Sequence, residues 1–326
     1  MAGEPLNTFQ LGSEAMEFFK HNANINFMAQ RQWAAILSVV LFLASLTSLA
    51  CYGLNWGLDF TGGTQIQLTY AHTADLGAIH DHLQQAGFPE AVVISYGSSK
   101  EVLVSLLPKG KANGALDEKS QAGMVAEVLK ALPDAKLSQV NYIGPQVGEE
   151  MVSKGLIAIM IALLGTMVYI AFCFDMRFAL GSTVALIHDP VLILGVFAYL
   201  HMEFNLITLA AILTVIGYSL NDTIVIFDRV REDFRKFRKA SAMEVMNQAI
   251  NQTLSRTIMT SALTLTVVLA LFFLGGTVLH GFSLALMIGI VVGTYSSIYV
   301  AGSLALVLGL DRQHVVPPLK EVDQRP

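Results

Sequence analysis

The sequence predicts an integral membrane protein: an all-α bundle of six transmembrane helices with an α+β, ferredoxin-like (βαββαβ) domain inserted after the first helix. Three observations predict this fold class. Of the 326 residues, 54% are hydrophobic and only 14% are charged, whereas soluble domains carry about 25% charged residues. Six apolar stretches are long enough to cross a bilayer. Between the first two, apolar and polar residues alternate as they do in strands.

The composition also argues against several other classes of protein. The net charge of −5 gives no basic face for nucleic acid. With only two cysteines the chain is not a disulfide scaffold, and its glycines follow no collagen-like period.

The six predicted spans follow from counting uncharged residues, because about 20 apolar residues cross a membrane as a helix. Three ionisable groups interrupt them: His188 and Asp189 in the third span, and Asp222 in the fourth. The predicted spans are residues 33–53, 156–174, 178–199, 204–227, 257–279 and 281–310, the last five forming one region at 151–310.

The connections between the spans predict their orientation. Connection 228–256 holds seven cations, whereas connections 201–203 and 275–280 hold no lysine or arginine. Because cytoplasmic connections are enriched in these residues, we expect 228–256 to lie in the cytoplasm. Both termini, segment 1–32 and tail 311–326, then lie in the cytoplasm, and residues 54–150 lie outside.

The outer segment, residues 54–150, is predicted to form one small domain. Its predicted strands are 64–70, 91–96, 101–107 and 137–143, and its helices are 76–87 and 124–132, with an exposed loop at 110–115. The order β-α-β-β-α-β is the ferredoxin-like arrangement. His80 and His82 lie near Asp81, but they point in different directions on a helix, which favours a solvated helix face over a metal site. We therefore expect the domain to contact extended polypeptide or a partner subunit.

Five strings carry a resemblance to a known family. They are GLDFTGG at 57–63, GPQVG at 144–148, HDP at 188–190, GYSLNDT at 217–223 and FDRVRE at 227–232. With the one-plus-five layout of spans, they resemble the SecD/SecF family of the bacterial Sec protein-export machinery, within the resistance–nodulation–division superfamily. The resemblance extends from about Trp33 to Leu310.

The resemblance implies a non-enzymatic subunit of the bacterial inner membrane, with residues 54–150 in the periplasm. It implies four partners: a SecD-like six-span subunit, the Sec translocation channel, unfolded preprotein on the periplasmic side, and the lipid bilayer. The implied energy source is the proton-motive force, and the chain has no phosphate-loop motif for ATP. No cofactor or metal is expected. Two alternatives stay open: a related transporter subunit for a lipid or small molecule, and a non-transporting scaffold.

Asp222 and Arg256 are the predicted proton relay. Asp222 lies six residues, about 9 Å, inward of Asp228, and Arg256 opens the fifth span from the same side. If they meet, the carboxylate is ionised when paired and favours the neutral form when the arginine withdraws. In the family, the matching positions are associated with proton flow. The alternative is a static ion pair. The expected polar shell is Tyr218, Ser219, Asn221 and Thr223.

Asp189 lies near the bilayer centre, where it either joins the relay or is a protonated packing residue; the residues do not decide between them. Gly181, Ala185 and Asp189 form a stripe that predicts contact with another helix. We expect His188 to point elsewhere and to be structural.

Two further patterns concern packing. Asp59 is expected to cap a turn or strand start where Gly62 and Gly63 permit a sharp bend. The family resemblance adds a hinge formed by Gly57, Asp59, Phe60, Gly62 and Gly63. A packing seam for another helix is predicted because small residues recur every four positions, at Gly289, Gly293, Ser297, Ala301 and Ala305. Since six spans make half of a two-repeat transporter bundle, the other half is expected from SecD or a second copy.

Overall fold

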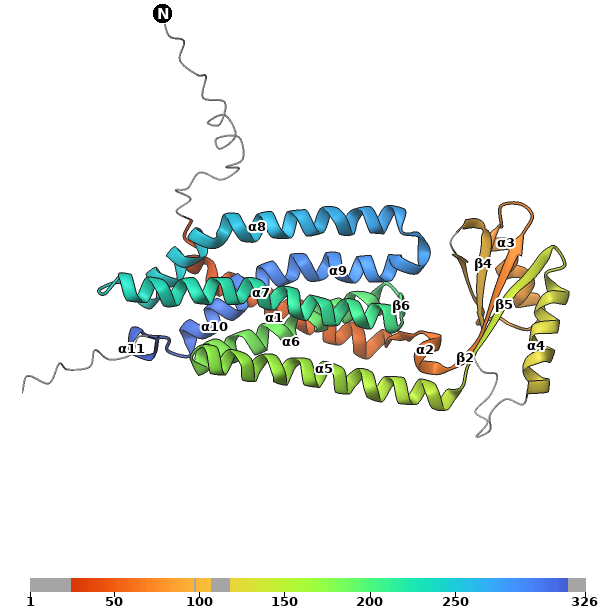
Figure 1. Ribbon diagram of the computed structural model, residues 1–326, viewed down its shortest axis with the longest axis horizontal. Coiled ribbons are helices and arrows are strands. Elements are labelled where there is room, and N and C mark those ends of the chain that lie inside the picture. Colours follow the sequence, from red (N-terminus) through yellow and green to blue (C-terminus); the bar gives the residue numbers. More distant parts are fainter. Residues whose placement is uncertain (1–24, 97, 107–117, 316–326) are drawn as a thin grey trace, which may run out of the picture.

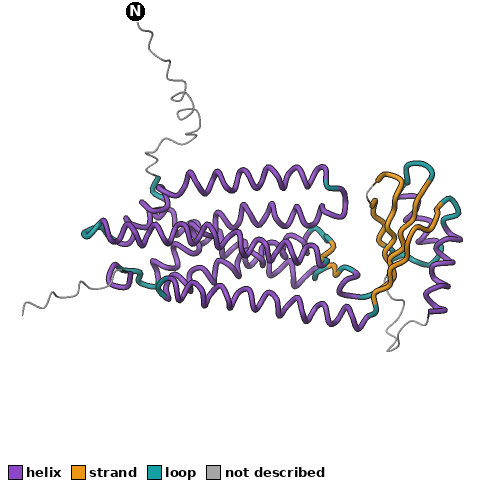
Figure 2. Tube along the Cα trace, in the orientation of Figure 1, coloured by secondary structure: helices purple, strands orange, loops and turns teal. Residues whose placement is uncertain are grey.

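The computed structural model describes residues 25–96, 98–106 and 118–315. A bundle of long helices carries a small α+β domain at one end (Figure 1; Figure 2). Within the described ranges, six helices are long and apolar enough to cross a membrane. The predicted fold class is therefore confirmed. The long helices are α1 (Arg31–Tyr52), α5 (Pro145–Cys173), α6 (Met176–Tyr199), α7 (Leu206–Lys236), α8 (Ala242–Leu274) and α9 (Gly276–Ser296), the last continued by a π-helix η2 (Ser297–Ala301) and by α10 (Gly302–Val307).

The connection predicted at 228–256 is mostly helical. Helix α7 runs on to Lys236 and α8 begins at Ala242. Hydropathy marks only the apolar part of a helix, whereas these extensions bury one face, including Phe234 and Val245, and expose the other. Ser241 starts α8 with a capping box that Glu244 completes. Two short helices, η1 (Phe27–Gln30) and α11 (Arg312–Val315), lie at the same end of the bundle (Figure 1).

The bundle has an inner and an outer set of helices. Helices α6, α7 and α9 bury much of their surface, whereas α1, α5 and α8 are exposed over most of theirs. Helix α1 packs on α6, α5 on α6, and α8 on α9 and α7. The buried polar side chains of the bundle are therefore concentrated between α6, α7 and α9.

The α+β domain has the predicted element order. Its elements are β2 (Gly63–Tyr70), α3 (Leu76–Gln85), β3 (Val92–Tyr96), β4 (Ser98–Leu106), α4 (Glu118–Ala131) and β5 (Ala135–Ile143). The four strands form an antiparallel sheet in the order β3-β4-β2-β5, with Thr64 of β2 opposite Leu106 of β4 and Tyr142 of β5. Ile66 and Leu68 share a core with Leu83 of α3 and Val128 of α4. The loop expected at 110–115 lies outside the described residues.

A small junction connects the domain to the bundle. Strand β1 (Asn55–Trp56) pairs in parallel with β6 (Glu203–Phe204), which lies between α6 and α7. The four-residue helix α2 (Leu58–Thr61) follows and leads directly into β2. The junction was not predicted, because segments this short show no periodicity.

Candidate functional site

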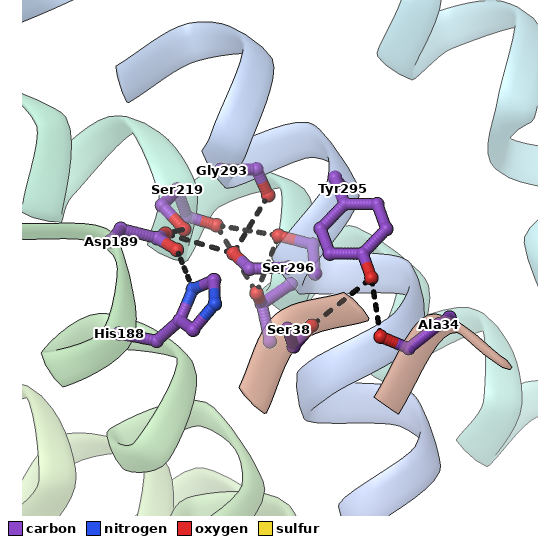
Figure 3. A network of polar contacts seen from close by, with 10 residues as sticks. Ala34, Ser38, His188, Asp189, Ser219, Gly293, Tyr295 and Ser296 are labelled. Atoms are coloured by element: carbon purple, nitrogen blue, oxygen red, sulfur yellow. Dashed lines mark hydrogen bonds and ion pairs between the residues drawn. The ribbon is translucent and has the colours of Figure 1, made fainter. Parts of the chain in front are cut away.

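Asp189 lies at the centre of a polar network inside the bundle (Figure 3). Its carboxylate is fully buried in α6. Two hydroxyls donate to Oδ2: Ser219 of α7 at 2.7 Å and Ser296 of α9 at 2.8 Å. Three helices therefore meet at one carboxylate. Since polar groups buried away from water need partners, this network specifies how the three helices pack.

His188 completes the network, and the expectation that it points elsewhere was wrong. Its Nδ1 lies 3.0 Å from Oδ1 of Asp189. The imidazole turns toward the next residue of α6, so the 100° between successive helical positions does not separate the two side chains. The ring also stacks on Phe42 of α1, with centroids 6.2 Å apart.

Asp222 is buried in α7, three residues after Ser219. The groups that act electrostatically on its carboxylate are the Arg256 guanidinium from α8 and the Thr294 hydroxyl from α9. No ion pair within 4.0 Å joins Asp222 to Arg256, which is exposed, and Oδ2 of Asp222 has no hydrogen-bond partner. The structure thus brings the two predicted relay residues within electrostatic range of each other without pairing them.

The residues expected to surround Asp222 are divided between two clusters. Tyr218 donates its hydroxyl to Ser261 of α8 at 3.1 Å, and Ser261 lies 2.9 Å from the Thr294 hydroxyl. Ser219 instead donates its hydroxyl to Asp189. Thr223 bonds the hydroxyl of Ser297 at 2.8 Å. Asn221 is exposed.

The predicted small-residue seam is occupied by helices of this same chain. A Cβ on Gly289 would lie 2.1 Å from Cγ2 of Val215, and one on Gly293 would lie 3.0 Å from Cβ of Ser219. Both contacts join α9 to α7. Farther along, Ala301 approaches Gly181 of α6, where a Cβ on the glycine would lie 2.8 Å from the Ala301 carbonyl oxygen. Ser297 and Ala305 on the same seam are also buried.

The glycine-rich junction clamps the domain to α7. Oδ2 of Asp59 accepts a hydrogen bond from the backbone N–H of Leu206 at 2.9 Å, so Asp59 caps α7 and not a local turn. The ring of Phe60 is buried and stacks on Phe204 with centroids 5.5 Å apart. Gly62 and Gly63 have φ values of 71° and 144°, which permit the bend into β2. The hinge stays a prediction.

An acidic pair lies beside this clamp. A Cβ on Gly57 would be 2.7 Å from Oε1 of Glu203, so any other residue at this position would displace that carboxyl. Burial raises the pKa of Glu203, and repulsion by the Asp59 carboxylate raises it further.

Sequence reasoning missed the hydroxyl groups that hold the two intramembrane acids. Thr294 and Ser296 belong to a polar string, Thr294-Tyr295-Ser296-Ser297, within an otherwise apolar span. Tyr295 donates to the backbone carbonyl of Ala34 at 2.7 Å and lies 3.0 Å from the Ser38 hydroxyl (Figure 3). Four consecutive polar residues in a membrane span could have predicted that this part of the helix packs inside the bundle.

The arrangement is suited to proton binding. A carboxyl group inside a bundle changes both its charge and its hydrogen-bond donors when it takes a proton. Because the partners of each acid lie on different helices, a proton taken up at Asp189 or Asp222 would change the contacts between those helices.

Comparisons with known proteins agree with the five sequence strings. Residues 124–311 match the model of the C-terminal region of the SecD/SecF protein export membrane proteins, and residues 48–74 match the SecD/SecF GG motif. The protein translocase subunit SecF of Vibrio alginolyticus is 43% identical over 310 residues, covering 94% of this chain and 96% of that protein. SecF of Pseudomonas aeruginosa is 45% identical over 304 residues, covering 93% and 98%.

A solved structure shows the same fold. The crystal structure of SecDF, a translocon-associated membrane protein from Thermus thermophilus, superposes with a TM-score of 0.76 at 36% identity. The match covers 89% of this chain, which spans 39% of the SecDF chain. Family model, relatives and fold agree, and the chain belongs to the SecD/SecF family as a non-enzymatic, SecF-type subunit of the Sec protein translocase.

Proposed function

We propose that this subunit uses the proton-motive force to assist export of preproteins across the bacterial inner membrane, with Asp222 and Arg256 as the proton relay. The observation that carries the proposal is the position of Asp222. It is buried and one of its oxygens has no hydrogen-bond partner, while Arg256 lies near it without pairing. Carrying an ionised side chain within a span costs a few kcal/mol on insertion scales, about 2.5 to 3.5. Such a group is stable only with a proton, a cation or water.

The junction offers a route from this proton to the outer domain. Helix α7 carries Asp222, and its first N–H group is held by Asp59. Asp59 lies in α2, which continues into β2, an inner strand of the domain sheet. A shift of α7 that accompanies protonation would therefore move α2 and the sheet with it. In this proposal the Gly57–Gly63 segment acts as the hinge.

The proposed topology follows the distribution of cations. Arg229, Arg231, Arg235 and Lys236 lie on the end of α7 that is remote from the α+β domain. This end is proposed to face the cytoplasm, together with both termini, and residues 54–150 to lie in the periplasm.

The proposed principal partner is a SecD-type six-span subunit. The exposed helices α1, α5 and α8 leave apolar faces at the edge of the bundle, and this chain matches 39% of the SecDF chain. The Sec channel, unfolded preprotein and lipid are the other proposed contacts.

The test is export into membrane vesicles under an imposed proton gradient. Asp222→Asn and Arg256→Gln should reach normal abundance and lose gradient-dependent export. Asp228→Asn, which removes an exposed carboxylate from the same helix, is the control and should export normally. Normal export by Asp222→Asn would contradict the proposal and favour a scaffold. Loss of lipid transfer without loss of export would favour the other transporter class.

A further inference from the structure

We infer that His188 and Asp189 form a second proton-binding site in the bundle, at which the proton binds to Nε2 of His188. This inference deepens the proposed function and rests on it for its coupling to export. The two residues are adjacent in α6, next to Pro190, and both are at least nine-tenths buried.

The first argument is the protonation state with which the contacts are compatible. Oδ2 of Asp189 accepts hydrogen bonds from the Ser219 and Ser296 hydroxyls. Among the described residues, the Ser219 hydroxyl donates to no other acceptor, so Oδ2 acts as an acceptor. Oδ1 faces Nδ1 of His188 at 3.0 Å. An ionised carboxylate is an acceptor only, so it accepts all three bonds if Nδ1 carries its hydrogen.

The second argument is the other ring nitrogen. With the hydrogen on Nδ1, neutral histidine has a lone pair on Nε2. Nε2 of His188 is buried and has no hydrogen-bond partner. Because no donor occupies this lone pair, Nε2 is free to accept a proton. The ring is held in place by Asp189 on one side and by Phe42 of α1 on its face.

The third argument is charge. A proton on Nε2 makes an imidazolium in direct contact with the Asp189 carboxylate, so the pair becomes neutral overall. Before protonation, the same pair carries one negative charge. Inside a membrane the neutral state is favoured, as it is for Asp222 when it takes a proton without Arg256. Histidine is also the side chain whose charge changes near physiological pH.

Few other groups around His188 could bind the proton in place of its Nε2. Helix α1 contributes Phe42 and Ser38 to this region, and α9 contributes Tyr295, whose hydroxyl is engaged by Ala34 and Ser38. Asp222 on α7 interacts with groups of α8 and α9. Tyr218 of α7 donates its hydroxyl to Ser261 of α8. The remaining ionisable side chains on the described parts of the elements packed against α6 are toward the helix ends or in η2: Arg31, Cys51, Tyr52, Glu149, Glu150, Lys154, Tyr169, Cys173, Asp228, Arg229, Arg231, Glu232, Asp233, Arg235, Lys236, His280 and Tyr299.

The position of the His188–Asp189 site relative to Asp222 suggests its role in the proposed relay. Ser219, which holds Asp189, comes three residues before Asp222 on α7, or about 4.5 Å nearer the domain end. In the proposed topology the His188–Asp189 site is thus the outer of two sites, and Asp222 the inner one. A proton from the periplasm would meet the outer site first.

The test is nitrogen NMR of the full-length protein labelled with ¹⁵N in its eight histidines. The His188 signals are assigned by their loss in His188→Asn, which keeps a donor toward Asp189 but has no basic nitrogen. At high pH we expect hydrogen on Nδ1 alone, and on lowering the pH to about 5 we expect Nε2 to gain a proton.

Export assays then separate this site from the relay. His188→Asn should reduce gradient-dependent export, whereas His280→Asn, a histidine at the start of α9, should not. An Nε2–H tautomer at high pH, or a His188 that stays neutral throughout, would overturn the inference. If His188 takes up a proton in the NMR experiment but His188→Asn exports normally, the coupling of this site to export would be overturned. The NMR result is independent of export, so failure of Asp222→Asn to impair export would count against the proposed function alone.

Discussion

The Ser219 hydroxyl donates to Oδ2 of Asp189 from a position one helical turn before Asp222 on α7. The two intramembrane acids are therefore connected through one turn of helix, although they lie on different helices. Gly293 of α9 packs against the same serine, with Cβ of Ser219 only 3.0 Å from where a Cβ on the glycine would be. Ser219 is thus the point at which α6, α7 and α9 are joined.

Removing this hydroxyl should destabilise the bundle. In Ser219→Ala, Oδ2 of Asp189 keeps only Ser296 as a donor, and we expect a loss of about 1 to 3 kcal/mol. Thermal unfolding of the purified protein measures it. Thr214→Ala is the control, because Thr214 is exposed on the same helix and bonds only the Ala210 carbonyl. Equal unfolding midpoints for the two variants would contradict the role of Ser219.

The α7–α9 contact should not tolerate an added methyl group. Gly289→Ala places a Cβ 2.1 Å from Cγ2 of Val215, and overpacking of this kind costs about 1 to 3 kcal/mol. Val215→Ala in the same chain should restore much of the loss, since it removes the clashing atoms. Thermal unfolding of the single and double variants provides the test. Gly165→Ala, where nothing lies within 4 Å, should be neutral. A double variant no more stable than Gly289→Ala would show that the contact is wrongly placed.

The bend into the domain should require glycine at position 63. In Gly63→Ala the new Cβ would lie 2.4 Å from the backbone oxygen of Leu106, at a φ of 144°. Strain and overpacking together should cost about 2 to 4 kcal/mol. Limited proteolysis should then cleave the domain faster. Gly123→Ala in α4, which has open space around it, should resist cleavage as the wild type does. Equal cleavage of both variants would refute the bend.

Stability should depend on pH through Glu203. Burial, with repulsion from Asp59, raises the pKa of Glu203, so the folded protein binds its proton more tightly than the unfolded chain does. This contribution is fully present below the ordinary glutamate pKa of about 4.3 and is lost as the pH rises through the folded value.

Glu203→Gln should consequently unfold at a higher temperature than the wild type at pH about 7.5, with the difference shrinking toward pH about 4. Thermal unfolding across this range measures it. Glu90→Gln, at an exposed position of the domain, should show no such dependence. A constant difference between Glu203→Gln and the wild type at every pH would refute the assignment.

Much of the fold was predictable because long periodic segments carry their own signal. The six spans follow from apolar length, and Ile66 and Leu68 alternate with polar residues on one sheet face. The β1–β6 pair and α2 were not predictable, since two strands of two residues and one helical turn depend on tertiary contacts. Asn55 and Glu203, which pair there, are 148 positions apart.

The site was predictable in part for a related reason. Helix rise alone predicted that Asp222 and Arg256 can lie at similar depth. It could not show that they stay unpaired, nor that Ser296 reaches Asp189 across 107 positions. The imidazole of His188 turns toward its neighbour by a choice of rotamer, which helical position does not determine.

Infrared difference spectroscopy of Asp222 tests the central claim most directly. Spectra of the full-length protein are recorded as the pH is lowered, for the wild type, Asp222→Asn and Asp228→Asn. Asp222 should gain a proton within the bundle, giving a carboxyl C=O stretch in the wild type and Asp228→Asn that Asp222→Asn lacks. Carboxyl bands that are identical in all three proteins would contradict the account.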